Sequence, residues 1–209
     1  FLRSMADDLP LQEWLFQQVF PREAVLKEMP DALVTFAKLA FLEYIANGIT
    51  AAFDMYFREY DYAQAAVDYG FRTVLCDALS ANNRWEELYE KYEGLNAFHP
   101  LVGYRLGFHA EYTASVDMLK FVSKAAHELK APVWSHNSET RSEVDGCIER
   151  HGVTPTKLFD ELGLFEYGGG GFHCVWMTDE DIDIFRRRGL TAVLNACSNG
   201  KLASGIPPL

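Results

Sequence analysis

The sequence lacks an excess of basic residues. Its 19 lysines and arginines are outnumbered by 30 aspartates and glutamates, which gives a formal net charge of -11 at pH 7. Nucleic acids and anionic membrane surfaces are bound by basic faces, so this charge argues against both as partners. We therefore expect the partners of the protein to be small molecules.

The chain also has few cysteines and no long apolar run. Its 4 cysteines show no Cys-x-x-Cys spacing, so we expect reduced thiols that pack in the interior. No apolar run reaches the roughly 20 residues of a membrane-spanning helix. The opening residues FLRSMADDLP do not follow the order of a signal peptide. These absences together favour a cytoplasmic protein.

What the chain does contain is an alternation of helical and strand-like segments. Apolar residues at helical spacing predict helices over residues 9–21, 31–48, 60–70, 84–95, 115–130, 140–152, 154–164 and 178–190. Nearly continuous apolar segments predict strands over residues 49–57, 71–79, 101–110, 131–136, 168–177 and 191–199. Buried strands that alternate with helices are typical of a parallel sheet covered by helices.

Two architectures fit this alternation, an open doubly wound sheet and a (β/α)8 barrel. The chain has no Gly-x-Gly-x-x-Gly motif opening a helix, which argues against the open sheet. The glycines at 168–171 stand at the start of the segment 168–177, ahead of its apolar residues, and do not open a helix; we interpret them as a flexible turn and not as a phosphate-binding loop. We predict an α/β fold over residues 1–209, a single domain that forms an incomplete TIM-type barrel with approximately strands 2 to 7.

Three of the predicted strands end in a histidine, at His109, His136 and His173. Catalytic groups of (β/α)8 barrels lie at the C-terminal ends of the strands. One such histidine would be read as a buried packing residue, but three on successive strands favour a functional site. We expect the remaining histidines on the surface: His99, His127 and His151.

Several segments share a pattern with one family. SHNSETRSEV contains H-x-x-E-T-x-x-E-V, and FHAEYTAS is close to H-A-P-Y-T. The same holds for LRSMADDLPLQEWL, GITAAFDMY, FHCVWMTDEDI and SNGKLASGIPPL. In this order the segments resemble the amidohydrolase superfamily, in the branch of the methylthioadenosine/S-adenosylhomocysteine deaminases and the triazine chlorohydrolases. The resemblance spans essentially the whole chain.

The resemblance implies a metal-dependent hydrolase that acts on a small heterocycle. Its reaction would release ammonia from an aminopurine, aminopyrimidine or triazine-like ring, or chloride from a chlorotriazine. His136 would bind the metal, and Glu139 would carry a proton from the metal-bound water to a ring nitrogen. His173 would orient the hydroxide and stabilise the oxyanion, while His109 would hydrogen-bond the substrate. From the residues alone, Glu139 fits equally well as a carboxylate stabilised at a helix start.

The implied cofactor is one divalent ion, zinc in the first place, with iron and manganese as alternatives. Such an ion lowers the pKa of bound water to about 7, and a nearby carboxylate can move the released proton. The family's His-x-His pair and its aspartate ligand have no counterpart in this chain. We therefore expect a chain that is truncated at both ends and inactive by itself, with the metal site empty or incomplete.

Three residues depart from the family pattern at positions where we expect the rim of the substrate site: Glu111, Leu194 and Ala196. The expected truncation would also leave two strand edges, at 49–57 and 191–199, that offer a route to self-association. The alternative to an enzyme is a non-catalytic barrel fragment or relative that acts as a fold or binding unit.

Overall fold

The computed structural model describes residue 6 and residues 8–208. The chain divides into two compact units, one of residues 1–77 with 87–105 and one of residues 78–86 with 106–209. Two ends of the family-like segments lie outside the described residues, namely most of LRSMAD and the final Leu209. Each unit is described by itself below.

The strands are parallel, and their spatial order equals their order in the chain. In the first unit β1 pairs with β2 from Ala51 opposite Arg72 onward, and in the second β4 pairs with β5 from Val133 opposite Gly169 onward. The strands are β1 (Ala51–Tyr56), β2 (Arg72–Asp77), β3 (Val102–Gly107), β4 (Val133–Asn137), β5 (Gly169–His173) and β6 (Thr191–Val193). Parallel strands in chain order, joined by helices, have the topology of a (β/α)8 barrel. The predicted incomplete TIM-type barrel is thereby confirmed.

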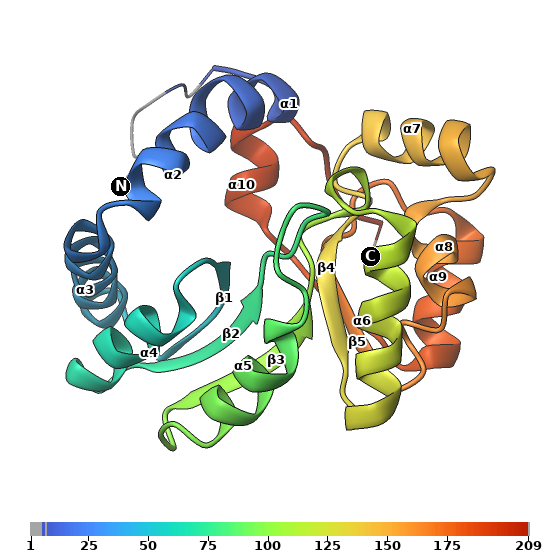
Figure 1. Ribbon diagram of the computed structural model, residues 1–209. Helices are drawn as coiled ribbons and strands as arrows, with labels where there is room; N and C mark the ends of the chain where they lie inside the picture. The colour runs from blue at the N-terminus through green and yellow to red at the C-terminus, as the bar shows by residue number, and fades with distance from the viewer. Residues whose placement is uncertain (1–5, 7, 209) are drawn as a thin grey trace. The chain divides into compact units, whose positions relative to one another are not determined.

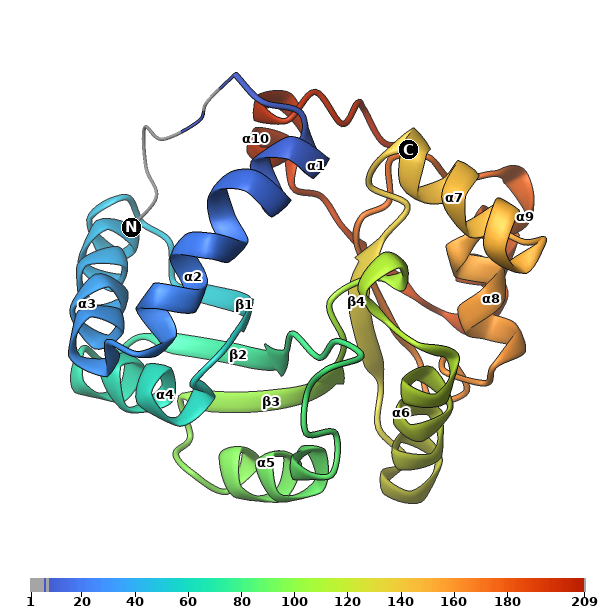
Figure 2. The ribbon, with the colours of Figure 1, turned by 45° about the horizontal axis from the view of Figure 1, so that its top comes forward.

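Helices of the first unit precede and follow its strands. They are α1 (Leu11–Glu13), the π-helix η1 (Trp14–Val19), α2 (Phe20–Lys27), α3 (Pro30–Ala46), α4 (Glu59–Asp68) and α5 (Glu87–Asn96). Figure 2 shows α4 beside β2 and α5 beside β3. Phe41 of α3 packs against α4 and against the residue before β2. Its ring centroid lies 5.0 Å from that of Tyr62 in α4 and 4.9 Å from that of Phe71. Such close aromatic pairs add to the burial of apolar surface in the core.

The helices of the second unit are the 3-10 helix η2 (Glu111–Thr113), α6 (Val116–Leu129), α7 (Arg141–His151), α8 (Pro155–Glu161), α9 (Asp179–Arg188) and α10 (Ala196–Lys201). Four of them, α6 to α9, begin at side chains that cap their first turn. Figure 1 shows α6, α8 and α9 beside β4 and β5. The side chains of Ser115, Thr140, Thr154 and Thr178 each accept a backbone N–H in the first turn of the helix that follows. This satisfies amides that would otherwise lack a partner at the helix start.

Three of the four glycines at 168–171 lie in a strand and not in the flexible turn that we predicted. Residues 169–171 belong to β5. A Cβ atom on Gly169 would collide with the carbonyl oxygen of Val133, and one on Gly170 with that of Thr191. The glycines are required because the neighbouring strands approach β5 too closely for a side chain.

The last predicted strand, 191–199, is also corrected. β6 ends at Val193, and Ala196–Lys201 forms the short helix α10. Asn, Ser and Gly are poor strand formers, and the Asn199 N–H donates to the Asn195 carbonyl at 2.8 Å. Within the described residues β1 pairs on one side only, with β2, and β6 on one side only, with β5. Self-association through these edges remains a prediction.

The cysteines of the described residues are free thiols. Cys76, Cys147 and Cys174 are buried as expected, whereas Cys197 is exposed. None of the described helices is long and apolar enough to cross a membrane.

Candidate active site

The strand-end histidines lie together in the second unit. The ring centroid of His136, in β4, lies 5.0 Å from that of His109 and 5.5 Å from that of His173. His109 follows β3, and His173 ends β5. Glu139 follows β4 directly, and its Oε1 lies 3.4 Å from Nδ1 of His173. The four predicted site residues therefore meet at the C-terminal ends of three neighbouring strands.

Hydrogen bonds fix which ring nitrogen carries the proton in His136 and His109. Nδ1 of His136 lies 2.7 Å from the carbonyl oxygen of His109, and a carbonyl only accepts. Nδ1 of His109 lies 3.0 Å from Oγ1 of Thr113, whose hydroxyl donates to the Ala110 carbonyl at 3.1 Å. Both rings hence carry the proton on Nδ1, which leaves Nε2 unprotonated. In this form an imidazole accepts a hydrogen bond or binds a metal.

The third histidine has the same arrangement with a side-chain partner. Nδ1 of His173 lies 2.7 Å from Oδ1 of Asn199. Because the amide oxygen accepts, His173 also carries its proton on Nδ1 and leaves Nε2 unprotonated.

Burial keeps these rings neutral. Burial, together with a smaller electrostatic contribution from His136, lowers the pKa of His109 to about 3 and that of His173 to about 4. The pKa of His136 is lowered by burial as well, against a hydrogen bond to the His109 carbonyl that raises it. At neutral pH the site therefore presents unprotonated nitrogens instead of positive charge.

Glu139 has the opposite shift. Its pKa is raised to about 7, mainly by burial and also by the charge of Glu143, against a hydrogen bond from Ser204 that lowers it. Ser204 Oγ donates to Glu139 Oε1 at 3.2 Å. A carboxyl group with a pKa near the working pH both takes up and gives off protons, which suits it to general acid–base catalysis.

The loop that carries Glu139 is held by a second glutamate. The carboxylate of Glu143 accepts the backbone N–H of Ser138 at 2.9 Å and that of Glu139 at 2.8 Å. Ser138 has a φ of +53°, a conformation that such bonds help to hold. The helix-start contacts to backbone amides thus belong to Glu143, while the carboxylate of Glu139 contacts Ser204 and His173.

Sequence reasoning missed Glu143, Asn199 and Ser204. Asn199 is 26 residues from His173 and Ser204 is 65 residues from Glu139, and no local periodicity signals contacts over such separations. The residues do lie inside the family-like segments SHNSETRSEV and SNGKLASGIPPL. Those segments were the signal that could have found them.

The described residues hold only part of a metal site. No group of three or more histidine, cysteine, aspartate or glutamate side chains among them is arranged to hold a metal ion. His136 fits the role of one ligand, because its Nδ1–H is bound to a carbonyl and its Nε2 is unprotonated. A catalytic zinc site needs about three protein ligands, so the described residues supply an incomplete set.

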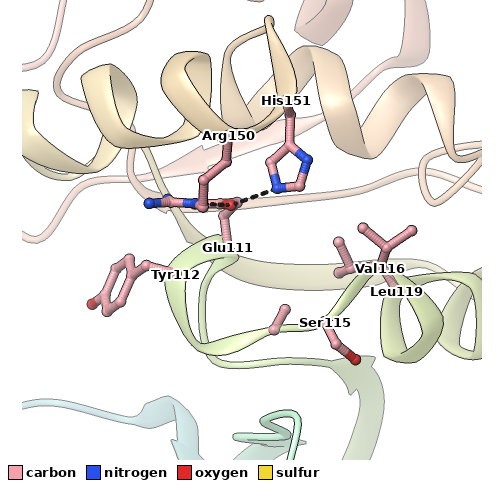
Figure 3. Close-up of a pocket in the computed structure, with 8 residues that line it drawn as sticks. Glu111, Tyr112, Ser115, Val116, Leu119, Arg150 and His151 are labelled. Carbon is pink, nitrogen blue, oxygen red and sulfur yellow. Dashed lines mark hydrogen bonds and ion pairs between the residues drawn. The ribbon is translucent and has the colours of Figure 1, made fainter.

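Glu111 turns towards α7. Its carboxylate is buried and pairs with the guanidinium of Arg150 and with Nε2 of His151, the latter at 3.1 Å (Figure 3). A pocket of about 280 Å³ adjoins this cluster, lined in part by Tyr112 and Ser115. Leu194 and Ala196, the other two positions that we expect at the rim of the substrate site, are exposed.

The remaining histidines follow the prediction only in part. His127 is exposed as predicted. His151 is half-buried against Glu111, and His99 is half-buried with its Nδ1 accepting the Leu101 N–H at 3.2 Å. The surface prediction is therefore wrong for these two.

Known proteins share both the sequence pattern and the fold. The amidohydrolase family matches residues 2–209. The 5-methylthioadenosine/S-adenosylhomocysteine deaminase of Caldicellulosiruptor saccharolyticus is 37% identical over 210 residues, which is 100% of this chain and 48% of that protein. The chain spans about half the length of the curated relatives it matches.

Two solved structures give the same result for the fold. An adenosine deaminase from Xanthomonas campestris with bound zinc superimposes with a TM-score of 0.90 at 29% identity, covering 99% of this chain and 49% of that one. An atrazine chlorohydrolase from Arthrobacter aurescens TC1, complexed with zinc, superimposes with a TM-score of 0.83 at 17% identity, covering 96% and 51%. The second likeness is one of fold alone. From the family match, which runs over nearly its whole length, the chain belongs to the amidohydrolase family.

Proposed function

We propose that the full-length protein is a hydrolase that deaminates an adenosine-like nucleoside. Water adds to the ring carbon that bears the amino group, the carbon–nitrogen bond breaks, and ammonia leaves while the ring carbon becomes a carbonyl. The observation that carries the proposal is the convergence of Glu139 with His109, His136 and His173 at the strand ends. The proposed substrate class is that of the relatives, a methylthioadenosine/S-adenosylhomocysteine deaminase and an adenosine deaminase.

Each side chain has a distinct part in the proposed reaction. Glu139 takes a proton from the attacking water and delivers it to a ring nitrogen, for which its pKa of about 7 is suited. His173 accepts a hydrogen bond from the water through Nε2 and orients it. His109, neutral because burial lowers its pKa to about 3, accepts a hydrogen bond from the substrate.

His136 would hold a divalent ion through Nε2, since its Nδ1–H is bound to the His109 carbonyl. When bound, such an ion would supply the acidity that makes hydroxide available near neutral pH. Zinc is the first candidate, because the adenosine deaminase of similar fold holds it. The residues of this chain fit one ligand position, so we also propose that residues 1–209 alone are inactive.

The test is ammonia release by the full-length protein, loaded with zinc and supplied with a panel of heterocycles. Adenosine, 5'-methylthioadenosine and S-adenosylhomocysteine form the expected group, and guanine, cytosine and a chlorotriazine form the comparison. We expect ammonia from the first group at rates well above those for the second. Chloride release from the chlorotriazine, with no ammonia from any compound, would show that the reaction is dechlorination and not deamination. No product from any compound would favour the alternative of a non-catalytic fold or binding unit.

A further inference from the structure

Two side chains from one short segment contact the two groups that the proposed reaction uses for proton transfer. Oδ1 of Asn199 lies 2.7 Å from Nδ1 of His173, and Oγ of Ser204 lies 3.2 Å from Oε1 of Glu139. All four residues are buried, with exposures of 2% to 4%. Hydrogen bonds in such a dry environment are costly to lose, because a buried partner left unpaired keeps its desolvation penalty.

The segment itself is held in place by further hydrogen bonds. The Ser204 N–H donates to the Asn199 carbonyl at 2.9 Å, which closes the turn between the two residues. The indole N–H of Trp176, in the loop after β5, donates to the Ser204 carbonyl at 2.8 Å. Asn199 and Ser204 are thus fixed relative to the loop that follows His173.

Nδ1 of His173 faces two oxygen atoms, Oδ1 of Asn199 at 2.7 Å and Oε1 of Glu139 at 3.4 Å, and only the nearer one, of Asn199, lies at a normal hydrogen-bond distance. With the amide oxygen towards Nδ1, the ring keeps its proton on Nδ1, and Nε2 is an acceptor. The reversed amide would present its NH₂ group and place the proton on Nε2. His173 could then not accept a hydrogen bond from water at Nε2, which the proposed reaction requires.

We propose that Asn199 and Ser204 are positioning residues: Asn199 holds His173 in the tautomer protonated on Nδ1, and Ser204 holds the carboxylate of Glu139 by donating to Oε1. This inference rests on the proposed function of His173 and Glu139. It adds a segment of the chain that supplies both orienting hydrogen bonds.

The tautomer of His173 is measurable without any substrate. In the full-length protein labelled with ¹⁵N-histidine, the nitrogen chemical shifts distinguish the two tautomers, and a His173→Gln variant assigns the signals. We expect the Nδ1–H form in the wild type and in Asn199→Asp, which keeps an acceptor. Asn199→Leu should give a mixture of tautomers.

An Nε2–H form in the wild type, or an unchanged Nδ1–H form in Asn199→Leu, would overturn the role of Asn199. If Asn199→Leu does not fold, the wild-type spectrum still decides between the two tautomers. Absence of ammonia release by the wild type would instead contradict the proposed function, so the two failures are distinguishable.

Ser204 is tested by kinetics with a matched control. Removing one hydrogen bond to a charged group by Ser204→Ala should lower kcat by roughly 10- to 100-fold, with little change in KM. Ser204→Thr keeps the hydroxyl and should restore most of the rate. Ser123 of α6, also buried, donates to the Leu162 carbonyl at 2.7 Å, and Ser123→Ala should leave kcat unchanged. Equal losses in the two alanine variants, or no rescue by threonine, would contradict a specific role of Ser204.

Discussion

Each of the two units buries a glutamate whose pKa is raised to about 7, Glu59 in the first and Glu139 in the second. Glu59 lies beside a cation: Nζ of Lys91 is 3.1 Å from Glu59 Oε1 and 2.7 Å from Asp77 Oδ2. Burial and the charge of Asp77 raise the pKa of Glu59, and Lys91 lowers it. The two carboxylates and the ammonium group thus form a largely buried ion-pair cluster between β2, α4 and α5.

Glu139 has different neighbours. In the part of the chain that the structure describes, no lysine or arginine forms an ion pair with it, and its contacts are Ser204 and the neutral ring of His173. Three unprotonated Nε2 atoms belong to the same cluster of side chains. A raised pKa alone therefore does not identify a catalytic group, because structural ion-pair networks also raise pKa values. The neighbouring groups distinguish the two cases.

The largest effect that would sharpen this contrast is expected for His136→Ala. We expect loss of the divalent ion and loss of deamination by at least the roughly 10² to 10⁴ of a missing catalytic group. His127→Ala, at an exposed histidine, should keep both. Metal analysis and ammonia release on the two purified variants check this. Full metal content in His136→Ala would show that the ligand is misassigned.

The next effect concerns stability in the first unit. Lys91→Met leaves two carboxylates buried without their cation, which should lower the free energy of unfolding by about 3 kcal/mol. The loss should be larger at about pH 8 than at pH 5, because Glu59, with a pKa of about 7, is ionised only at the higher pH. Urea unfolding at both pH values measures it. Lys124→Met, at a lysine side chain that is 68% exposed, is the control and should have little effect. Equal losses in the two variants would remove the structural role of Lys91.

A smaller effect on stability is expected at Glu139. Its raised pKa means that the folded state binds the proton more tightly than the unfolded state, so this contribution to stability is present at low pH and is lost as the pH rises through about 7. Glutamine does not ionise, so the Glu139→Gln variant does not lose this stability as the pH rises. The variant should gain about 1 to 3 kcal/mol relative to the wild type between about pH 5 and pH 8. Urea unfolding across this range measures the difference. A difference in the free energy of unfolding that does not change with pH would contradict the raised pKa.

The smallest effect is expected for Arg150→Ala. The Arg150 side chain is 47% exposed, and Glu111 keeps its second partner, His151. We expect a loss of about 1 kcal/mol or less, measured by the same urea unfolding. A loss as large as that of Lys91→Met would mean that the pair with Glu111 is as important to stability as the buried cluster around Lys91.

Much of this architecture could be predicted from the sequence, because periodicity is local. The apolar spacing located every strand, and the histidines at strand ends marked His109, His136 and His173 as a group. The interpretation of residues 168–171 as a turn was wrong, because the close approach of the neighbouring strands requires glycine in β5. Periodicity failed after Val193, where Asn and Ser residues turn an expected strand into α10.

The side chains that orient the site residues could not be predicted from local sequence patterns. Asn199 and Ser204 contact residues far away in the sequence. Both carboxylate oxygens of Glu143 accept hydrogen bonds from backbone amides of the loop after β4. Such contacts depend on how the strands are brought together. Only the family-like segments, which include these residues, could have indicated them.

The most direct test of the contrast between the two glutamates compares Glu139→Gln with Glu59→Gln in the full-length protein. Both substitutions remove a buried carboxyl group with a pKa of about 7. We predict that kcat/KM for the deaminated nucleoside falls by about 10² to 10⁴ in Glu139→Gln, with metal content retained, and stays within about threefold of the wild type in Glu59→Gln. Equal losses in the two variants, or a Glu139→Gln enzyme as fast as the wild type, would contradict the assignment of proton transfer to Glu139.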